Sequence, residues 1–348
     1  MTKKLIASLL LICLALLPVC SLAGDTLNIM NYGDYIDEQI IYDFEKEFGV
    51  RVNYSTNDTP ESMYTKLQTG VSYDVVVTSD YMIDRLIKEN KIMKLDKSIV
   101  TNLDQLSDQV KNLYFDPDND YSVPYFWQNV VLCYDTTKID PEKVEEKGWG
   151  ILHDPELEGH VFLYDSPRDI FMMALKALGY SMNTESRDEL TQAYDWLVKM
   201  NQTIHPSFVS DEMIDGMAQG EKWMAMMYSG DATYASMENE KLTVWAPLDG
   251  TNIAYDNMFI PANAANPEMA NRFINYVLDY PNSKRNTVLT CYTSPNAKVV
   301  EDLTAPGGEF EGIESYLPRS GYDKDEIYTD NELLRTETPE LLVKVKLQ

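Results

Sequence analysis

Short apolar segments and amphipathic helices alternate along most of this chain, and that alternation limits the fold more than any single motif does. Residues 27–32 have the composition of a strand that Gly33 ends. Apolar residues then recur every fourth position over residues 36–48, which predicts a helix closed by Gly49. Strands that alternate with helices form βαβ units, so we expect mostly parallel sheets with helices on both faces.

The same alternation continues to about residue 89 and returns from about residue 161. We expect strands at residues 50–54, 74–77, 161–164, 223–228, 242–246 and 253–260, and helices at residues 63–67, 81–89, 168–178, 186–200 and 271–278, with another beginning near residue 229. The chain has 348 residues, beyond the size at which a single hydrophobic core stops growing. No low-complexity linker or short repeat interrupts it. Two α/β lobes, joined by more than one crossing segment, are therefore expected.

The first residues have the pattern of a signal peptide. Lys3 and Lys4 precede an apolar run without charged residues from Leu5 to Val19, which is too short to span a bilayer comfortably. The rest of the chain contains no comparable run. We therefore predict that the protein is exported and has no membrane-spanning segment.

Two cleavage sites are open for this segment, which would occupy residues 1–23. Small residues at 21–23 allow cleavage before Gly24. Residues 17–20 resemble a lipobox, which makes Cys20 a candidate lipidation site, although Val19 is bulkier than the residue usual before that cysteine. The charge-poor segment after Cys20 would serve as a tether, which favours lipidation. A lipid there would hold the folded part beside the membrane.

The charge balance sets the sign of the expected partner. The chain carries 56 acidic and 29 basic residues, a formal net charge of −27, and its hydrophobic content of 44% is that of a globular protein. Such a surface repels nucleic acid and anionic lipid and concentrates small cations. We expect no nucleic-acid partner and membrane contact only through the lipid anchor. The same charge is also compatible with a role in solubility alone.

The sequence contains no pattern that indicates catalysis. His153, His160 and His205 form no metal-binding HExxH or HxH motif, and neither a GxxxxGK loop nor a GxSxG turn is present. The chain is therefore predicted to be a binding protein rather than an enzyme, without a cofactor or metal. Cys133 and Cys291 either form a bridge in an oxidising compartment or are simply buried, and both alternatives remain open.

Aromatic residues lie beside acidic residues at four expected strand ends. In an α/β sheet the loops at the carboxyl ends of strands gather at one edge and build the binding site. Carboxylates suit the ammonium ends of a dication, and flat rings suit both its methylenes and its charge. The four segments are Tyr32-Gly33-Asp34-Tyr35, Ser79-Asp80-Tyr81, Tyr228-Ser229-Gly230-Asp231 and Tyr255-Asp256.

At these segments the chain resembles the periplasmic spermidine/putrescine-binding proteins of ABC transporters (PotD/PotF type). The resemblance covers nearly all of the chain after the signal peptide, and the order and spacing of its segments are specific. Its most telling segments are residues 31–35, 54–56, 63–67, 73–77, 119–125, 173–181, 260–264 and 292–296.

The resemblance implies an α/β fold with two lobes, the type II periplasmic-binding-protein fold, in which mixed sheets are flanked by helices and the ligand lies in the cleft between the lobes. It divides the chain after the signal peptide into an N-terminal lobe of residues 24–134 and 258–302 and a C-terminal lobe of residues 135–257 and 303–348. Crossings are expected near Tyr134, near Asp256 and after Val300. Closure would occur by hinge bending.

It also implies a ligand site that can be transferred residue by residue. The implied ligand-binding residues are Tyr32, Gly33, Asp34, Tyr35, Ser79, Tyr81, Ser166, Asp169, Tyr228, Asp231, Asp256 and Tyr292. One departure concerns the ligand. Where spermidine-preferring members have a Trp two residues before the acid at 256, this chain has Ala254, and Tyr255 beside it should point the other way. Asp34 and Asp231 resemble acids of putrescine-preferring members.

The predicted function is therefore capture of putrescine or spermidine outside the cytoplasm and delivery to an ABC transporter permease. Two alternatives stay open at this point. A carrier of ferric or other cations would use clustered tyrosines as ligands, whereas the tyrosines here are dispersed over several strand ends. A surface interaction protein that kept the fold would have lost the cleft acids, whereas Asp34, Asp169, Asp231 and Asp256 are all present.

Overall fold

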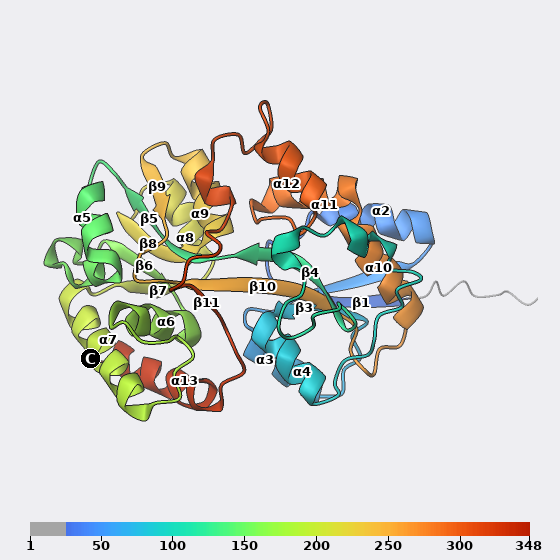
Figure 1. The fold of residues 1–348 in the computed structure, drawn as a ribbon, viewed down its shortest axis with the longest axis horizontal. Coiled ribbons are helices and arrows are strands. Elements are labelled where there is room, and N and C mark those ends of the chain that lie inside the picture. Colours follow the sequence, from blue (N-terminus) through green and yellow to red (C-terminus); the bar gives the residue numbers. More distant parts are fainter. Residues whose placement is uncertain (1–25) are drawn as a thin grey trace, which may run out of the picture.

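A computed structural model describes residues 26–348, which form two β-sheets, each surrounded by helices (Figure 1). The predicted signal peptide and Cys20 lie outside these residues. Within residues 26–348, no helix combines the length and the apolar character needed to cross a membrane.

The first sheet has six strands. Its hydrogen-bonded order is β11-β10-β3-β1-β2, and β4 pairs with the same central strand, β10. The strands are β1 (Thr26–Asn31), β2 (Arg51–Thr56), β3 (Val75–Ser79), β4 (Ser122–Gln128), β10 (Asn252–Phe259) and β11 (Glu326–Ile327). Strands β1, β2 and β3 run parallel, whereas β10 runs antiparallel to both β3 and β4.

The second sheet has five strands in the order β7-β6-β8-β5-β9. These are β5 (Val130–Asp135), β6 (Val161–Tyr164), β7 (Ser207–Val209), β8 (Met224–Tyr228) and β9 (Leu242–Trp245). Strand β5 pairs antiparallel with both β8 and β9, and the other pairs are parallel. The prediction of mostly parallel sheets holds only in part. Five of the nine strand pairs in the described part of the chain are parallel, and the four antiparallel pairs all involve β5 or β10, which each enter their sheet from the other one. The mixed sheets implied by the resemblance are confirmed.

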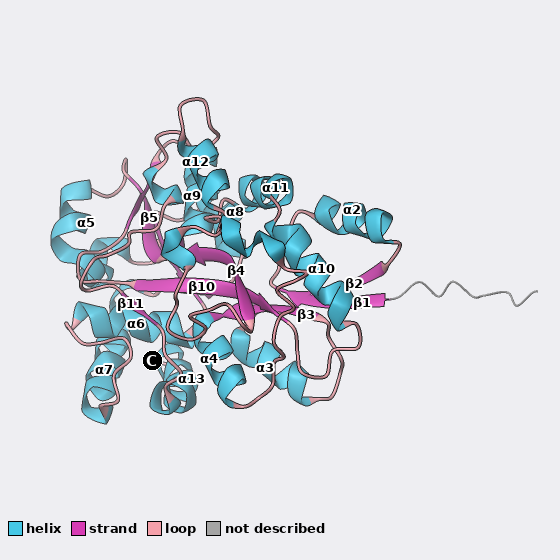
Figure 2. Cartoon of the chain, turned by 45° about the vertical axis from the view of Figure 1, so that its right-hand side comes forward, coloured by secondary structure: helices cyan, strands magenta, loops and turns pink. Residues whose placement is uncertain are grey.

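Helices cover both faces of each sheet (Figures 1 and 2). Around the first sheet lie α2 (Glu38–Phe48), α3 (Pro60–Gln68), α4 (Asp80–Lys88), α10 (Pro267–Leu278), α11 (Tyr280–Thr290) and α12 (Ala297–Thr304). Around the second lie α5 (Pro141–Lys147), α6 (Pro167–Ala177), α7 (Arg187–Ile204), α8 (Glu212–Ala218), α9 (Ser229–Glu238) and α13 (Glu332–Lys346).

Local sequence signals explain where the helices begin and end. The Asp37 side chain accepts a hydrogen bond from the Gln39 N–H at the start of α2, and Gly49 ends that helix in the left-handed conformation, with φ of 65°. Between these caps the apolar stripe buries Ile40 and Phe44 completely. Ser166 caps α6 in the same way, by accepting a hydrogen bond from the Asp169 N–H, and so fixes the first turn of that helix at the site described below.

The chain passes between the sheets at three places. Strands β4 and β5 are separated only by Asn129, and the second passage lies between β9 and β10. Both passages fall a few residues before the positions expected from sequence, and the division into lobes at residues 134/135, 257/258 and 302/303 remains a prediction. The third passage follows α12 and leads through β11 to α13.

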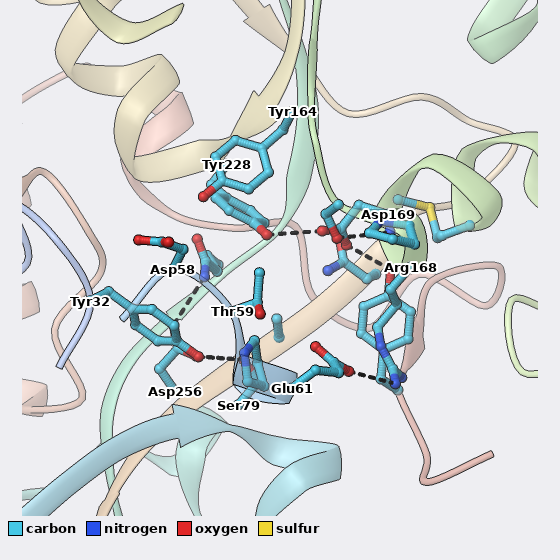
Figure 3. A pocket seen from close by; sticks show the side chains of 18 of the residues that line it. Tyr32, Asp58, Thr59, Glu61, Ser79, Tyr164, Arg168, Asp169, Tyr228 and Asp256 are labelled. Carbon is cyan, nitrogen blue, oxygen red and sulfur yellow. Dashed lines mark hydrogen bonds and ion pairs between the residues drawn. The ribbon is translucent and has the colours of Figure 1, made fainter. Parts of the chain in front are cut away.

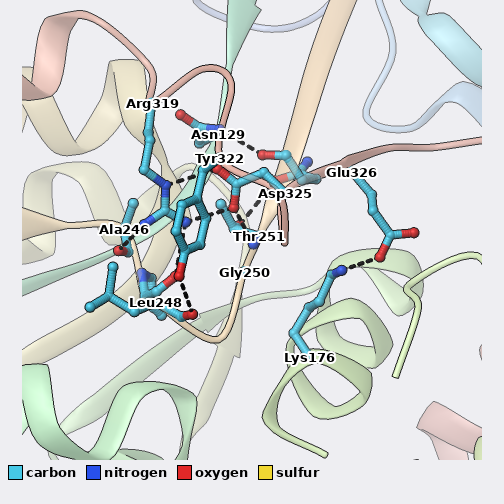
Figure 4. Close-up of polar contacts among 12 residues, drawn as sticks. Asn129, Lys176, Ala246, Leu248, Gly250, Thr251, Arg319, Tyr322, Asp325 and Glu326 are labelled. Carbon is cyan, nitrogen blue, oxygen red and sulfur yellow. Dashed lines mark hydrogen bonds and ion pairs between the residues drawn. The ribbon is translucent and has the colours of Figure 1, made fainter. Parts of the chain in front are cut away.

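Hydrogen bonds tie these passages together. The Asn129 amide donates to the Asn252 carbonyl (2.7 Å), and the Val130 N–H donates to the Asn252 side chain (2.7 Å). Figure 4 shows the third passage joining them, because the Thr251 N–H donates to Asp325 (2.9 Å) and Arg319 forms an ion pair with the same carboxylate. The three passages are thus joined by hydrogen bonds into one unit rather than forming three separate linkers.

The two cysteines do not form a bridge. Cys133 lies in β5 of the second sheet and Cys291 ends α11 beside the first, and both are free and buried. The alternative of singly buried cysteines therefore holds.

Candidate functional site

A cavity of about 370 Å³ lies between two groups of elements (Figure 3): the first sheet with its helices, and the second sheet with its helices. All twelve residues predicted from sequence line it. The first group contributes the ends of β1, β3 and β10, and the second contributes β8 and the first turns of α6 and α9. Segments separated by up to 260 residues in the chain thus surround one space, as the resemblance implied. Their role as ligand contacts remains a prediction.

Asp256 is the acidic centre contributed by the first sheet. It is 2% exposed, and three donors hold its carboxylate: the Tyr35 hydroxyl (2.7 Å), the Ser79 hydroxyl (2.8 Å) and the Gln128 amide (3.1 Å). Burial raises the pKa of Asp256, while the hydrogen bonds from Tyr35 and Ser79 oppose the rise. A cation placed beside this carboxylate would offset the cost of burying its charge.

Asp169 is the corresponding centre on the other side. It stands in the first turn of α6 and is 4% exposed. The Tyr228 hydroxyl donates to one of its oxygens (2.8 Å) and the Tyr328 hydroxyl to the other (2.7 Å). Burial and the adjacent carboxylate hold the pKa values of both tyrosines well above the ordinary value, so the phenols stay protonated and act as donors.

A third group of acids lies at another part of the cavity. Burial raises the pKa of Asp231 to about 7, and a hydrogen bond with Tyr292 and the nearby carboxylates of Asp211 and Asp34 act on it as well. Burial and the charge of Asp34 also raise the pKa of Asp211. Negative charges from both sides of the cavity therefore meet here without a basic partner among the lining residues nearest them.

Tyrosine rings form the walls between these acids. Tyr32 and Tyr35 pack edge to face with ring centroids 5.6 Å apart, and Tyr35 and Tyr292 do so at 4.7 Å. On the other side Tyr164 and Tyr228 lie 4.8 Å apart. Rings in these positions provide apolar contact for methylene groups and an attractive face for an ammonium group.

Among the aromatic and acidic residues of the four predicted segments, Asp80 and Tyr255 do not line the cavity. Asp80 is fully buried and accepts hydrogen bonds from the N–H groups of Tyr81 (2.6 Å) and Tyr255 (3.1 Å), so it holds backbone together. Tyr255 points away, as its alternation in β10 predicted, and its hydroxyl donates to the Gln109 carbonyl (3.2 Å).

Sequence reasoning missed several residues that line the cavity. Arg168 stacks on Tyr81, with its guanidinium carbon 3.4 Å from the ring centroid, and a nitrogen lies 3.8 Å from a Glu61 oxygen (Figure 3). Tyr328 follows the short strand β11 and reaches Asp169 from there. Neither Arg168 nor Tyr328 stands beside an aromatic and acidic pair at the end of a predicted strand. Tyr164 does, because Asp165 follows it where the predicted strand at residues 161–164 ends, and this pair was overlooked. The polar and aromatic lining residues that were missed include Glu61, Gln128, Tyr164, Arg168, Asp211, Asn252 and Tyr328.

The arrangement suits a small, flexible molecule with more than one positive charge. Separate carboxylates from both groups of elements can each hold one cationic end, and the rings can cover the apolar part between them. Among residues 26–348, no group of three or more His, Cys, Asp or Glu side chains is arranged to hold a metal ion.

Comparison with known proteins shows which family this sequence matches. Residues 39–308 match the family model described as bacterial extracellular solute-binding protein. The spermidine/putrescine-binding periplasmic protein of Salmonella typhimurium is 37% identical over 275 residues, which are 78% of each chain.

Solved structures are also similar to this chain over most of its length. A protein structure from Listeria monocytogenes is 36% identical, with a TM-score of 0.85 over 93% of this chain and 99% of that one. The spermidine/putrescine ABC transporter substrate-binding protein PotD of Streptococcus pneumoniae is 30% identical, with a TM-score of 0.73 over 93% and 99% of the two chains.

Proposed function

The chain belongs to the bacterial extracellular solute-binding proteins, and on that premise we propose that it captures a linear polyamine, putrescine or spermidine, and delivers it to an ABC transporter. The related proteins carry these ligands in their names, and the site has the chemistry that such ligands require. The family places the protein outside the cytoplasm.

The observation that supports this function best is the pair of buried acids on opposite sides of the cavity. Asp256 belongs to the first sheet and Asp169 to α6 beside the second, and each is held by hydroxyl donors. A diamine that spans them would neutralise both charges and link the two sides. That link is the physical basis we propose for closure around the ligand.

Three further parts of the proposal rest on the same premise. The protein acts by binding and performs no catalysis of its own. The permease of the transporter is its partner. A lipid on Cys20 holds it at the membrane, which the mass of the mature N-terminal peptide would test. The alternatives of a ferric-ion carrier and of a surface interaction protein have no support from the related proteins.

Native mass spectrometry of gently purified protein tests the function directly, because a retained ligand adds its own mass. Putrescine and spermidine should also raise the melting temperature, since a ligand that binds only the folded state stabilises it by mass action. If neither amine shifts the melting temperature while iron or an amino acid does, the proposed function is wrong.

Charge-neutral variants test the site. Asp256→Asn and Asp169→Asn should each weaken binding by roughly 2–5 kcal/mol, because one ammonium group loses its charged partner in a closed cavity. Glu142→Gln and Glu145→Gln are matched controls, since both side chains are exposed on α5, far from the lining residues in the fold. Equal losses in controls and site variants would mean that the attraction is diffuse.

A further inference from the structure

Gln128 ends β4 and lines the cavity, with 6% of its surface exposed. Its side-chain nitrogen donates to an Asp256 oxygen at 3.1 Å. An ionised carboxylate only accepts hydrogen bonds, so the NH2 side of the amide must face Asp256, and the carbonyl oxygen Oε1 must face elsewhere. That oxygen is buried and has no hydrogen-bond partner among residues 26–348.

The strand register explains why a glutamine fits there. Gln128 is the direct partner of Ala254 in the antiparallel pair β4–β10. Asn252, Ala254 and Asp256 alternate along β10 and all line the cavity, whereas Tyr255 between them points to the other side. A methyl group at position 254 leaves the space next to it free for the longer amide side chain.

An unpaired buried acceptor beside a carboxylate matches the needs of a primary ammonium group. Such a group has three N–H donors, and in a site without water each must find an acceptor. The oxygens of Asp256 already accept three hydrogen bonds from Tyr35, Ser79 and Gln128, so they have limited capacity left. The free Oε1 of Gln128 supplies an additional acceptor.

We propose that Gln128 is a ligand-binding residue that accepts an N–H from the ammonium group held at Asp256, and that it selects a primary over an alkylated ammonium at that end. The inference rests on the proposed function and adds to it the chemical class of the ligand's terminus. Gln128 joins Asp256, Tyr35 and Ser79 in one hydrogen-bonded cluster, and the hydrogen bond to Asp256 fixes the amide in the orientation that the ligand requires.

Calorimetry with two dications tests this assignment. Putrescine has three N–H donors at each end, whereas N,N,N′,N′-tetramethylputrescine keeps both charges and has one donor at each end. Gln128→Leu should weaken putrescine binding about tenfold and change binding of the tetramethyl analogue by no more than about twofold. Displacement by putrescine gives the dissociation constant of the analogue where direct titration is too weak.

The outcomes distinguish a failure of the proposed function from a failure of the role assigned to Gln128. If the wild type binds neither putrescine nor spermidine, the proposed function fails. If it binds putrescine and Gln128→Leu weakens both dications equally, or weakens neither, the assignment of Gln128 is wrong. Gln105→Leu is the matched control, because Gln105 is a half-buried glutamine that bonds Asn102 and Asn296 and does not line the cavity. Should Gln128→Leu not fold, Gln128→Met keeps the length of the side chain and gives the same test.

Discussion

Asp231 is an acid of the cavity whose pKa lies near neutrality. Burial raises its pKa to about 7, and the carboxylates of Asp211 and Asp34 add to the rise. An ammonium group needs the ionised form, so below that pH the ligand must displace a proton. Affinity for putrescine should therefore fall as the pH is lowered from about 8 to about 6, by up to about tenfold per pH unit.

The stability of the ligand-free protein should change in the opposite direction. In the unfolded chain Asp231 titrates near its ordinary value of 3.8, so between about pH 4 and pH 7 the folded state holds more protons. The contribution of this residue to stability is present below that range and is lost as the pH rises through it. Asp231→Asn should flatten both profiles, measured by calorimetry and by melting temperature. Unchanged slopes in that variant would assign the titration to another acid.

Ligand choice is also decided by single residues. From sequence we expect putrescine to bind at least as tightly as spermidine, with no more than about tenfold discrimination, and Ala254→Trp to shift preference toward spermidine. The strand register changes the expectation for Ala254→Trp alone, because Gln128 lies directly opposite Ala254 and occupies the space that the ring would need. Trp at 254 alone should collide with that amide and weaken both ligands. The pair Gln128→Gly and Ala254→Trp should accept the ring and favour spermidine, as calorimetry with both amines would show. A pair variant with wild-type preference would contradict this.

The residues that could be predicted are those whose neighbours in sequence carry the signal. Tyr32, Asp34 and Tyr228 stand where an expected strand ends, and strand ends gather at one edge of a sheet. Tyr328 could not be found in this way, because it reaches the cavity only through the passage that follows α12. Gln128 lies in a largely apolar stretch, residues 123–134, in which no strand end was predicted. The division of this stretch into β4 and β5 at Asn129 depends on tertiary hydrogen bonds.

At the scale of elements, the third passage is fastened to the second by an ion pair. Arg319 donates to both oxygens of Asp325 and to the carbonyls of Ala246 and Pro247, and the Asp325 side chain is completely buried (Figure 4). Gly250 lies against this segment with φ of 102°, and a Cβ there would come within 2.3 Å of the Lys324 carbonyl oxygen. The ion pair therefore holds the third passage against the second, and a glycine at position 250 leaves room for the Lys324 carbonyl.

Asp325→Asn should therefore lower the free energy of unfolding by roughly 3 kcal/mol, since Arg319 would keep its charge without a charged partner in a largely buried place. Urea unfolding measures this, and Asp323→Asn is the control, because Asp323 is an exposed aspartate two residues away that should change stability by less than about 0.5 kcal/mol. Equal effects of the two changes would show that the ion pair between Arg319 and Asp325 does not stabilise the contact between the second and third passages.

Element order followed from the sequence where apolar periodicity was strong, as in α2, α6 and α10. The direction of each strand could not be predicted, because it depends on the side from which the chain enters the sheet. Strand β10 enters the first sheet from the side of the second sheet, and it therefore pairs antiparallel with β3. Periodicity describes which face of a segment is buried, and it contains no information about the path that the chain takes before it.

At the scale of the whole molecule, the net charge of −27 acts on the ligand before any contact is made. A cavity with acids on both sides concentrates this field and should accelerate the approach of a dication. Exposed charges are screened over about 10 Å at 0.1 M salt and about 3 Å at 1 M, whereas buried pairs are screened much less. Association should therefore slow several-fold as salt is raised. Dissociation should change little, because the ligand contacts that we propose at Asp256 and Asp169 are buried.

Stopped-flow fluorescence of the aromatic residues near the cavity would give both rate constants at each salt concentration. Glu142→Gln combined with Glu145→Gln removes two exposed charges and should slow association slightly without changing dissociation. Asp169→Asn should mainly accelerate dissociation, because it removes a buried contact. If salt instead accelerates dissociation as much as it slows association, the ligand is held by exposed charges. The buried acids would then not be the centres of the site.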